Sequence, residues 1–115
     1  MLAREHRLRK AYEIARVYKK GSYGSAEGVL SVKAVSSGHP HARAVVVVPK
    51  KVSKRAVVRN HLRRRLVGLL QQDWATVRSG YDIVISVHSD IGQLPASNLR
   101  QYLTAALKRA GVVSN

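Results

Sequence analysis

Residues 43–66 read RAVVVVPKKVSKRAVVRNHLRRRL, and this stretch decides the fold. The valine run that follows Ala44 ends at Pro49 and predicts a β-strand over residues 43–48. Because the run is apolar at nearly every position, we expect both faces of the strand to be buried. The sequence therefore predicts that this strand lies in the centre of the sheet.

A long helix is predicted after the valine strand, from Ala56 to about Thr76. Its apolar residues fall on one side at 100° per residue, namely Val58, Leu62, Leu66, Leu69 and Leu70. Residues 50–65 contain no acid and carry a dense set of cations, namely Lys50, Lys51, Lys54, Arg55, Arg59, Arg63, Arg64 and Arg65. A solvated helix face normally mixes both signs, so this segment favours a polyanion site.

The rest of the chain divides into short elements. We expect a helix over 10–20 that stops at Gly21, a very short strand around Tyr23, strands over 29–35 and 81–88, and a last helix from Pro95 to Gly111. The strand over 43–48 is expected to be the neighbour of the strand over 29–35. The pattern predicts one α+β domain over residues 1–115, with helices packed against a small sheet.

The composition limits the class of protein. The 115 residues include 21 Lys and Arg against 6 Asp and Glu, a net charge of +15, and no Cys. Hydrophobic residues make up 45% of the chain, too many for a disordered basic tail. Such a charge on a small folded domain destabilises it unless a polyanion neutralises it, which points to nucleic acid or an anionic membrane. The charged first residues and the lack of a membrane-length apolar run predict a cytoplasmic protein.

The polar residues offer no recognisable catalytic centre. The histidines and acids do not form a paired-carboxylate or two-metal pattern. His39 and His41 flank Pro40 in a polar loop, without a third metal ligand nearby in the sequence. We therefore assign neither a catalytic residue nor a metal site to this chain.

The segment 43–66 resembles the signature of the bacterial ribonuclease P protein subunit, which has a buried strand, a Lys-Lys turn and a helix with an Arg-Asn-Arg core. The matching residues are Lys50, Lys51, Ala56, Val57, Arg59, Asn60, His61, Arg63 and Arg64. Residues 6–10, 18–21 and 80–84 are similar to further parts of that family, in the same order. His61 stands where the family has its second Arg, and Ile14 and Tyr18 stand where it usually has two Phe.

The resemblance implies a two-layer α+β sandwich with element order αβββαβα and a small mixed sheet. It also implies a left-handed βαβ crossover around the basic helix. The residues alone would predict the opposite hand, because about 98% of such crossovers are right-handed.

The resemblance also implies the function. The chain would assist removal of the 5′ leader from precursor tRNA by the ribonuclease P holoenzyme, whose RNA subunit holds the catalytic Mg²⁺. Its partners would be that RNA subunit and precursor tRNA, with no membrane and no obligate protein partner. The RNA-binding residues would be Lys50, Lys51, Lys54, Arg55, Arg59, Asn60, His61, Arg63, Arg64 and Arg65. A groove for the single-stranded leader would contain Ile14, Tyr18, Arg7, Arg9 and Val47.

Three alternatives stay open from the sequence. The chain could be a ribosomal or other structured-RNA-binding protein, although it has no GXXG loop between two helices, which a KH domain needs. It could lie on a membrane surface through its basic amphipathic helix, although that helix needs its apolar side for the core. Tyr18 could be an ordinary core residue of the first helix, because its spacing from Ile14 fits a core stripe as well as a stacking surface.

Overall fold

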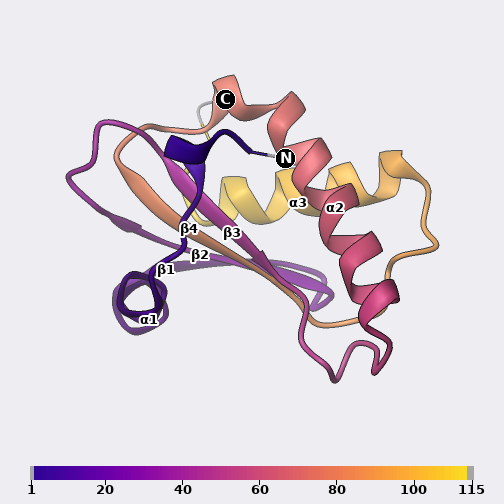
Figure 1. The fold of residues 1–115 in the computed structure, drawn as a ribbon. Helices are drawn as coiled ribbons and strands as arrows, with labels where there is room; N and C mark the ends of the chain where they lie inside the picture. The colour runs from indigo at the N-terminus through magenta and orange to yellow at the C-terminus, as the bar shows by residue number, and fades with distance from the viewer. Residues whose placement is uncertain (1, 114–115) are drawn as a thin grey trace.

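The fold is a four-stranded sheet with helices on both of its faces (Figure 1). A computed structural model describes residues 2–113. Its elements are the 3-10 turn η1 (Arg4–His6), α1 (Ala11–Lys20), β1 (Ser22–Ala26), β2 (Leu30–Ser36), β3 (Arg43–Val47), α2 (Ala56–Gln72), the 3-10 turn η2 (Trp74–Thr76), β4 (Tyr81–Val87) and α3 (Ala96–Arg109). The predicted α+β class and the order αβββαβα are confirmed.

The sheet is mixed, with strand order β1-β2-β4-β3. β2 pairs antiparallel with both β1 and β4, whereas β3 and β4 run parallel. Parallel neighbours need a crossover, and α2 supplies it between β3 and β4. The left hand of this crossover stays a prediction from the resemblance.

The valine strand does not lie where its sequence predicted. β3 is at the edge of the sheet, and β4 is its one neighbouring strand within residues 2–113, so both its central position and its pairing with the strand over 29–35 were wrong. Its burial alternates: Ala44 and Val46 are buried, and Val45 and Val47 are half-buried. The run is apolar because both faces meet apolar neighbours: Ala44 and Val46 belong to the main core, and Val45 and Val47 pack against the small cluster of Leu8, Val17 and Val84 on the other face.

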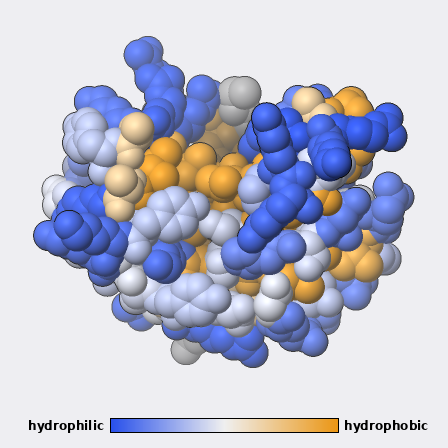
Figure 2. Space-filling model, turned by 90° about the horizontal axis from the view of Figure 1, so that it is seen from below, coloured by the Kyte–Doolittle hydropathy of each residue, from blue (hydrophilic) through white to orange (hydrophobic). Residues whose placement is uncertain are grey.

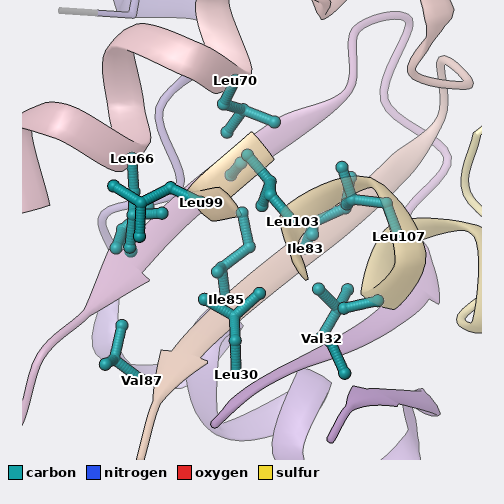
Figure 3. Packing of buried hydrophobic residues seen from close by; sticks show 14 of the residues in the cluster. Leu30, Val32, Leu66, Leu70, Ile83, Ile85, Val87, Leu99, Leu103 and Leu107 are labelled. Atoms are coloured by element: carbon teal, nitrogen blue, oxygen red, sulfur yellow. The ribbon is translucent and has the colours of Figure 1, made fainter. Parts of the chain in front are cut away.

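The main core lies between the sheet and the pair α2 and α3 (Figure 3). α2 contributes Leu62, Leu66 and Leu70, each at most 1% exposed. Figure 3 shows Leu66 and Leu70 facing side chains of β4 and α3, with Leu30 and Val32 of β2 below them. The predicted apolar stripe of the basic helix is thus a core stripe, and it fixes which side of α2 faces solvent.

A smaller core cluster holds α1 on the opposite face of the sheet. It consists of Leu8, Val17 and Val84, with Ile14 and the half-buried valines of β3 packed around it. Figure 1 shows α1 alone on this face, across the sheet from α2 and α3. Because one short helix covers only part of the face, the remainder is left for other contacts.

Arg43 joins α1 to the sheet through a partly buried ion cluster. Its Nε and one terminal nitrogen each donate a 2.9 Å hydrogen bond to Asp82, and that terminal nitrogen also donates to Glu13 of α1 at 2.8 Å. The Asp82 side chain is 1% exposed. The hydrogen bonds to Asp82 raise the pKa of Arg43 against the opposing effect of burial, and the bond to Glu13 raises it further. The guanidinium therefore stays charged and bridges β3, β4 and α1.

Gly24 sets the distance between β1 and α3. A Cβ atom at this position would lie 2.4 Å from the carbonyl oxygen of Ala106 and 2.5 Å from the amide nitrogen of Ala110. Both are backbone atoms of α3 or its end, so neither can move aside as a flexible side chain would. Only glycine allows the strand and the helix to pack at this distance.

We expect Arg43→Met to destabilise the protein by about 3 to 5 kcal/mol, because it leaves the Asp82 carboxylate buried without a cationic partner. Arg100→Met is the matched control, since the Arg100–Asp73 pair is far more exposed, with side chains 53% and 29% accessible. The control should change the free energy of unfolding by no more than about 1 kcal/mol. Urea unfolding measures both, and equal losses would contradict a structural role for Arg43.

Gly24→Ala should destabilise the protein by about 1 to 3 kcal/mol through overpacking against α3. The control is Gly68→Ala in α2, where an added Cβ meets nothing within 4 Å. That change should stabilise the protein by about 0.5 to 1 kcal/mol, because alanine favours the helix. Thermal unfolding of the two variants distinguishes them, and a neutral Gly24→Ala would refute the close approach.

Candidate nucleic-acid interface

The buried stripe of α2 turns the basic residues of that helix toward solvent. His61 and Arg64 lie on the side opposite the stripe, and both are exposed. Asn60 and Arg63 lie between that side and the β3 edge and are half-buried. Asn60, His61, Arg63 and Arg64 are therefore presented on one accessible strip of the helix, whereas Arg59 borders the apolar stripe.

Internal hydrogen bonds fix part of this strip before any ligand binds. The Arg59 guanidinium donates to the carbonyl oxygens of Ser53 at 2.9 Å and Lys54 at 3.1 Å, which ties the preceding loop to the helix. Arg63 donates to the side-chain oxygen of Asn60. Such ordering lowers the entropy that these side chains lose on binding.

The loop before α2 carries the most accessible charges. Lys50, Lys51, Lys54 and Arg55 are all exposed. Among residues 2–113, no ion pair engages any of these four side chains. Their positive charges therefore remain available to an external anion.

Arg65 is separated from the other predicted RNA-binding residues. It lies two residues after Arg63, which is about 200° around the helix, so the two side chains leave α2 on opposite flanks. Its guanidinium donates a 2.8 Å hydrogen bond to the carbonyl oxygen of Gly92. The sequence grouped Arg65 with the basic strip, but the structure places it against the loop before α3.

The uncovered part of the α1 face forms an apolar strip beside charged side chains. Val45 and Val47 of β3 are half-buried there and surround the buried Val84 of β4. Figure 2, which views the molecule from below relative to Figure 1, shows an apolar area bordered by hydrophilic side chains. Val47, which was predicted to line the leader groove, thus lies on this apolar strip.

Tyr18 lines this face and is not a core residue. Its side chain is 42% exposed, whereas the neighbouring Val17 is fully buried. The Tyr18 hydroxyl is 3.2 Å from the hydroxyl oxygen of Ser86 on β4, and the Lys33 ammonium lies 5.9 Å from the ring centroid. The alternative that Tyr18 belongs to the core was therefore wrong. Ile14, by contrast, is half-buried in the small cluster under α1.

Arg7 and Arg9 lie at the other end of α1, near α2. Backbone contacts hold this segment against the edge of β3: Arg7 forms a bridge with Ala44, and the Leu8 amide donates to the Ala44 carbonyl at 3.0 Å. Arg7 and Arg9 line a cleft of about 210 Å³ together with Arg63. The structure therefore groups these two residues with the basic helix and not with Tyr18.

Some polar residues of this face were missed by the sequence reasoning. Lys33 donates to the Tyr18 carbonyl at 2.9 Å, and the Ser31 hydroxyl is 2.7 Å from Nε2 of His88. With Ser86, these residues form a polar end of the face next to Tyr18. The sequence did contain a signal for these residues. Successive side chains of a strand point to opposite faces of the sheet, so polar residues that alternate with apolar ones indicate the face that lies away from the main core.

The acids do not gather into a metal centre within the described residues. No group of three or more His, Asp or Glu side chains in residues 2–113 is placed to hold a metal ion. Arg43 engages both Glu13 and Asp82, and Arg100 engages Asp73. None of the helices in residues 2–113 is long and apolar enough to cross a membrane.

Comparisons with known proteins give one consistent family. The family model described as Ribonuclease P matches residues 2–111. The ribonuclease P protein component of Pseudanabaena sp. is 38% identical over 88 residues, covering 76% of this chain and 75% of the relative. That of Symbiobacterium thermophilum is 31% identical and covers 97% of this chain and 96% of the relative.

Solved structures of the same name have the same fold. The Staphylococcus aureus RNase P protein superposes with a TM-score of 0.81 at 24% identity and covers 95% of this chain and 98% of its own. The Thermotoga maritima RNase P protein gives a TM-score of 0.79 at 24% identity, with coverage of 90% and 96%. The match of the family model over nearly the whole described chain, together with these relatives and this fold, shows that the chain belongs to the ribonuclease P protein family.

Proposed function

We propose that this chain assists the maturation of tRNA 5′ ends by binding two RNA surfaces with two faces of its fold. Its family is the protein component of ribonuclease P, the endoribonuclease that performs this maturation. The strip on α2 with the loop before it would bind the RNA subunit. The groove between α1 and β3 would hold the 5′ leader of the precursor tRNA.

The observation that carries the proposal is the run of cations at the start of α2. Residues 50–65 contain no acid, and internal hydrogen bonds already order Arg59 and Arg63. A single-sign, preordered cluster suits the closely spaced phosphates of a folded RNA, because each neutralised phosphate releases counterions. Arginine adds bidentate contacts to phosphate oxygens.

The groove beside α1 suits a single strand better than a duplex. It combines half-buried valines on its floor with the accessible ring of Tyr18, and Lys33 lies next to that ring. Unpaired bases can stack on an aromatic side chain, whereas the bases of a duplex are already stacked on each other. A 5′ leader offers such bases, and mature tRNA lacks them.

We further propose that the Mg²⁺ ions of the reaction are held by the RNA subunit. Metal ions at such a centre stabilise the attacking and leaving oxygens of the phosphodiester. The described residues do not fit that role, since no three of their His, Asp and Glu side chains are placed to hold a metal ion, and arginines engage Glu13, Asp73 and Asp82. This chain would therefore position RNA without a catalytic residue of its own.

We assign this chain to the cytoplasm, and we propose that it acts without an obligate protein partner.

Reconstitution tests the proposed function. The nuclease-treated protein is added to a bacterial ribonuclease P RNA at a Mg²⁺ concentration too low for the RNA alone, and cleavage of precursor tRNA is followed. We expect cleavage at the 5′ end of the mature tRNA only when both components are present. Binding without stimulation would favour a general structured-RNA-binding protein. Cleavage by the protein alone would overturn the assignment of catalysis to the RNA.

Tyr18→Ala should lower the affinity of the holoenzyme for precursor tRNA and leave its affinity for mature tRNA unchanged. The lost stacking surface is worth about 1 to 3 kcal/mol per base. Tyr12→Ala is the matched control on the same helix, because Tyr12 is 69% exposed and lies on the side of α1 away from Val17. Equal losses for both RNAs, or equal effects of the two variants, would exclude Tyr18 from the groove.

A further inference from the structure

A second basic cleft adjoins the cleft that Arg7 and Arg9 share with Arg63, and it is separate from the groove beside Tyr18. It has a volume of about 320 Å³ and forms where residues 4–10 meet the loop between β2 and β3. Its cationic and imidazole lining comes from Arg4, Arg7, Arg9, Lys10, His39 and His41. We name it the N-terminal cleft.

The N-terminal cleft has an uncompensated positive charge. Glu13 and Arg43 also line it, but they bind each other at 2.8 Å, and Arg43 is further held by Asp82. Glu5 is then the acid that remains among the lining residues. In residues 2–113, no ion pair engages Arg4, Arg9 or Lys10. Like charges this close repel unless an anion lies between them.

The ligand that fits this chemistry is a phosphate group. Guanidinium groups bind phosphate oxygens through paired hydrogen bonds, and the ammonium of Lys10 adds a point charge. His39 and His41 contribute imidazoles from a second segment, so the donors approach from two sides of the cleft. In a protein of this family, the phosphate belongs to an RNA backbone.

The position of the cleft favours the RNA subunit over the leader. Arg7 and Arg9 line both the N-terminal cleft and the smaller cleft that contains Arg63 of α2. A basic path therefore runs from α2 across the edge of β3 to the N-terminal cleft. Tyr18, in contrast, lies eight residues after Lys10, which corresponds to about 12 Å along α1.

We propose that the N-terminal cleft is a second phosphate-binding site for the RNA subunit. Arg9 and Lys10 then belong to the RNA-subunit contact and not to the leader groove. This inference rests on the proposed function, since it assumes that α2 binds that RNA. It adds a contact at the opposite end of α1 from Tyr18.

The test is the salt dependence of binding to the isolated RNA subunit. The double variant Arg9→Gln with Lys10→Gln should reduce the slope of log K against log salt by about 1.5, which means about 30-fold weaker binding at 0.1 M salt. The control Arg78→Gln with Lys108→Gln removes the same charge from exposed sites outside both surfaces. We expect it to weaken binding by no more than about threefold.

A comparison of substrates separates the two RNAs. Loss of the N-terminal cleft should leave the preference for precursor over mature tRNA unchanged once the holoenzyme is assembled, whereas Tyr18→Ala should reduce that preference. If the Arg9→Gln, Lys10→Gln variant binds the RNA subunit as tightly as the Arg78→Gln, Lys108→Gln control, the inference is overturned. A loss that appears only with precursor tRNA would also overturn it and would assign the cleft to the leader.

A titration of the unaltered protein with inorganic pyrophosphate, followed by NMR, requires no variant to fold. We expect the backbone amides of His39 and His41 to shift with saturation, and shifts confined to residues 50–65 would refute the site. If the unaltered protein binds no ribonuclease P RNA, the proposed function itself fails. If the protein binds this RNA and stimulates cleavage, but neither the salt dependence nor the pyrophosphate titration detects binding at the N-terminal cleft, only the inference about the cleft is wrong.

Discussion

The bidentate contact of Arg43 with Asp82 is the interaction on which the rest of the structure depends. It lies at the start of the parallel pair β3 and β4, so it connects the edge strand to the strand beside it. Through Glu13 it also holds α1 against the sheet. The charge cluster therefore ties one end of α1 to β3 and β4, and the small apolar cluster under α1 completes the attachment.

The position of β3 at the edge explains how two RNA surfaces coexist on so small a fold. One side of β3 faces α2 through the buried Ala44 and Val46, and the other side offers Val45 and Val47 to the groove. The basic loop that follows β3 leads directly into α2. If β3 were a central strand, another strand would pair with its free edge. The groove and the basic helix would then no longer lie next to each other.

The sequence predicted the elements well because their signals are local. The leucine stripe of α2, the stop at Gly21 and the strand at residues 81–88 agree with the structure within a few residues. The place of β3 in the sheet was not predictable, because an apolar run reports burial and not the number of neighbouring strands. Helical spacing alone puts Arg63 and Arg65 on opposite flanks of α2, but which flank continues the basic strip follows only from where Gly92 and the β3 edge lie. The exposure of Tyr18 likewise depends on Val17 taking the core position.

The contact of residues 7 and 8 with Ala44 has a consequence for the behaviour of the protein in solution. An open edge strand presents unpaired amide and carbonyl groups that can recruit a strand from another molecule. Here the segment before α1 occupies part of that edge, through the Arg7–Ala44 bridge and the hydrogen bond from the Leu8 amide. Arg7 and Arg9 of this segment carry positive charge, which repels a second copy of a chain with net charge +15. The segment therefore covers part of the β3 edge, and removing it would expose more of that edge to pairing with a strand of a second molecule.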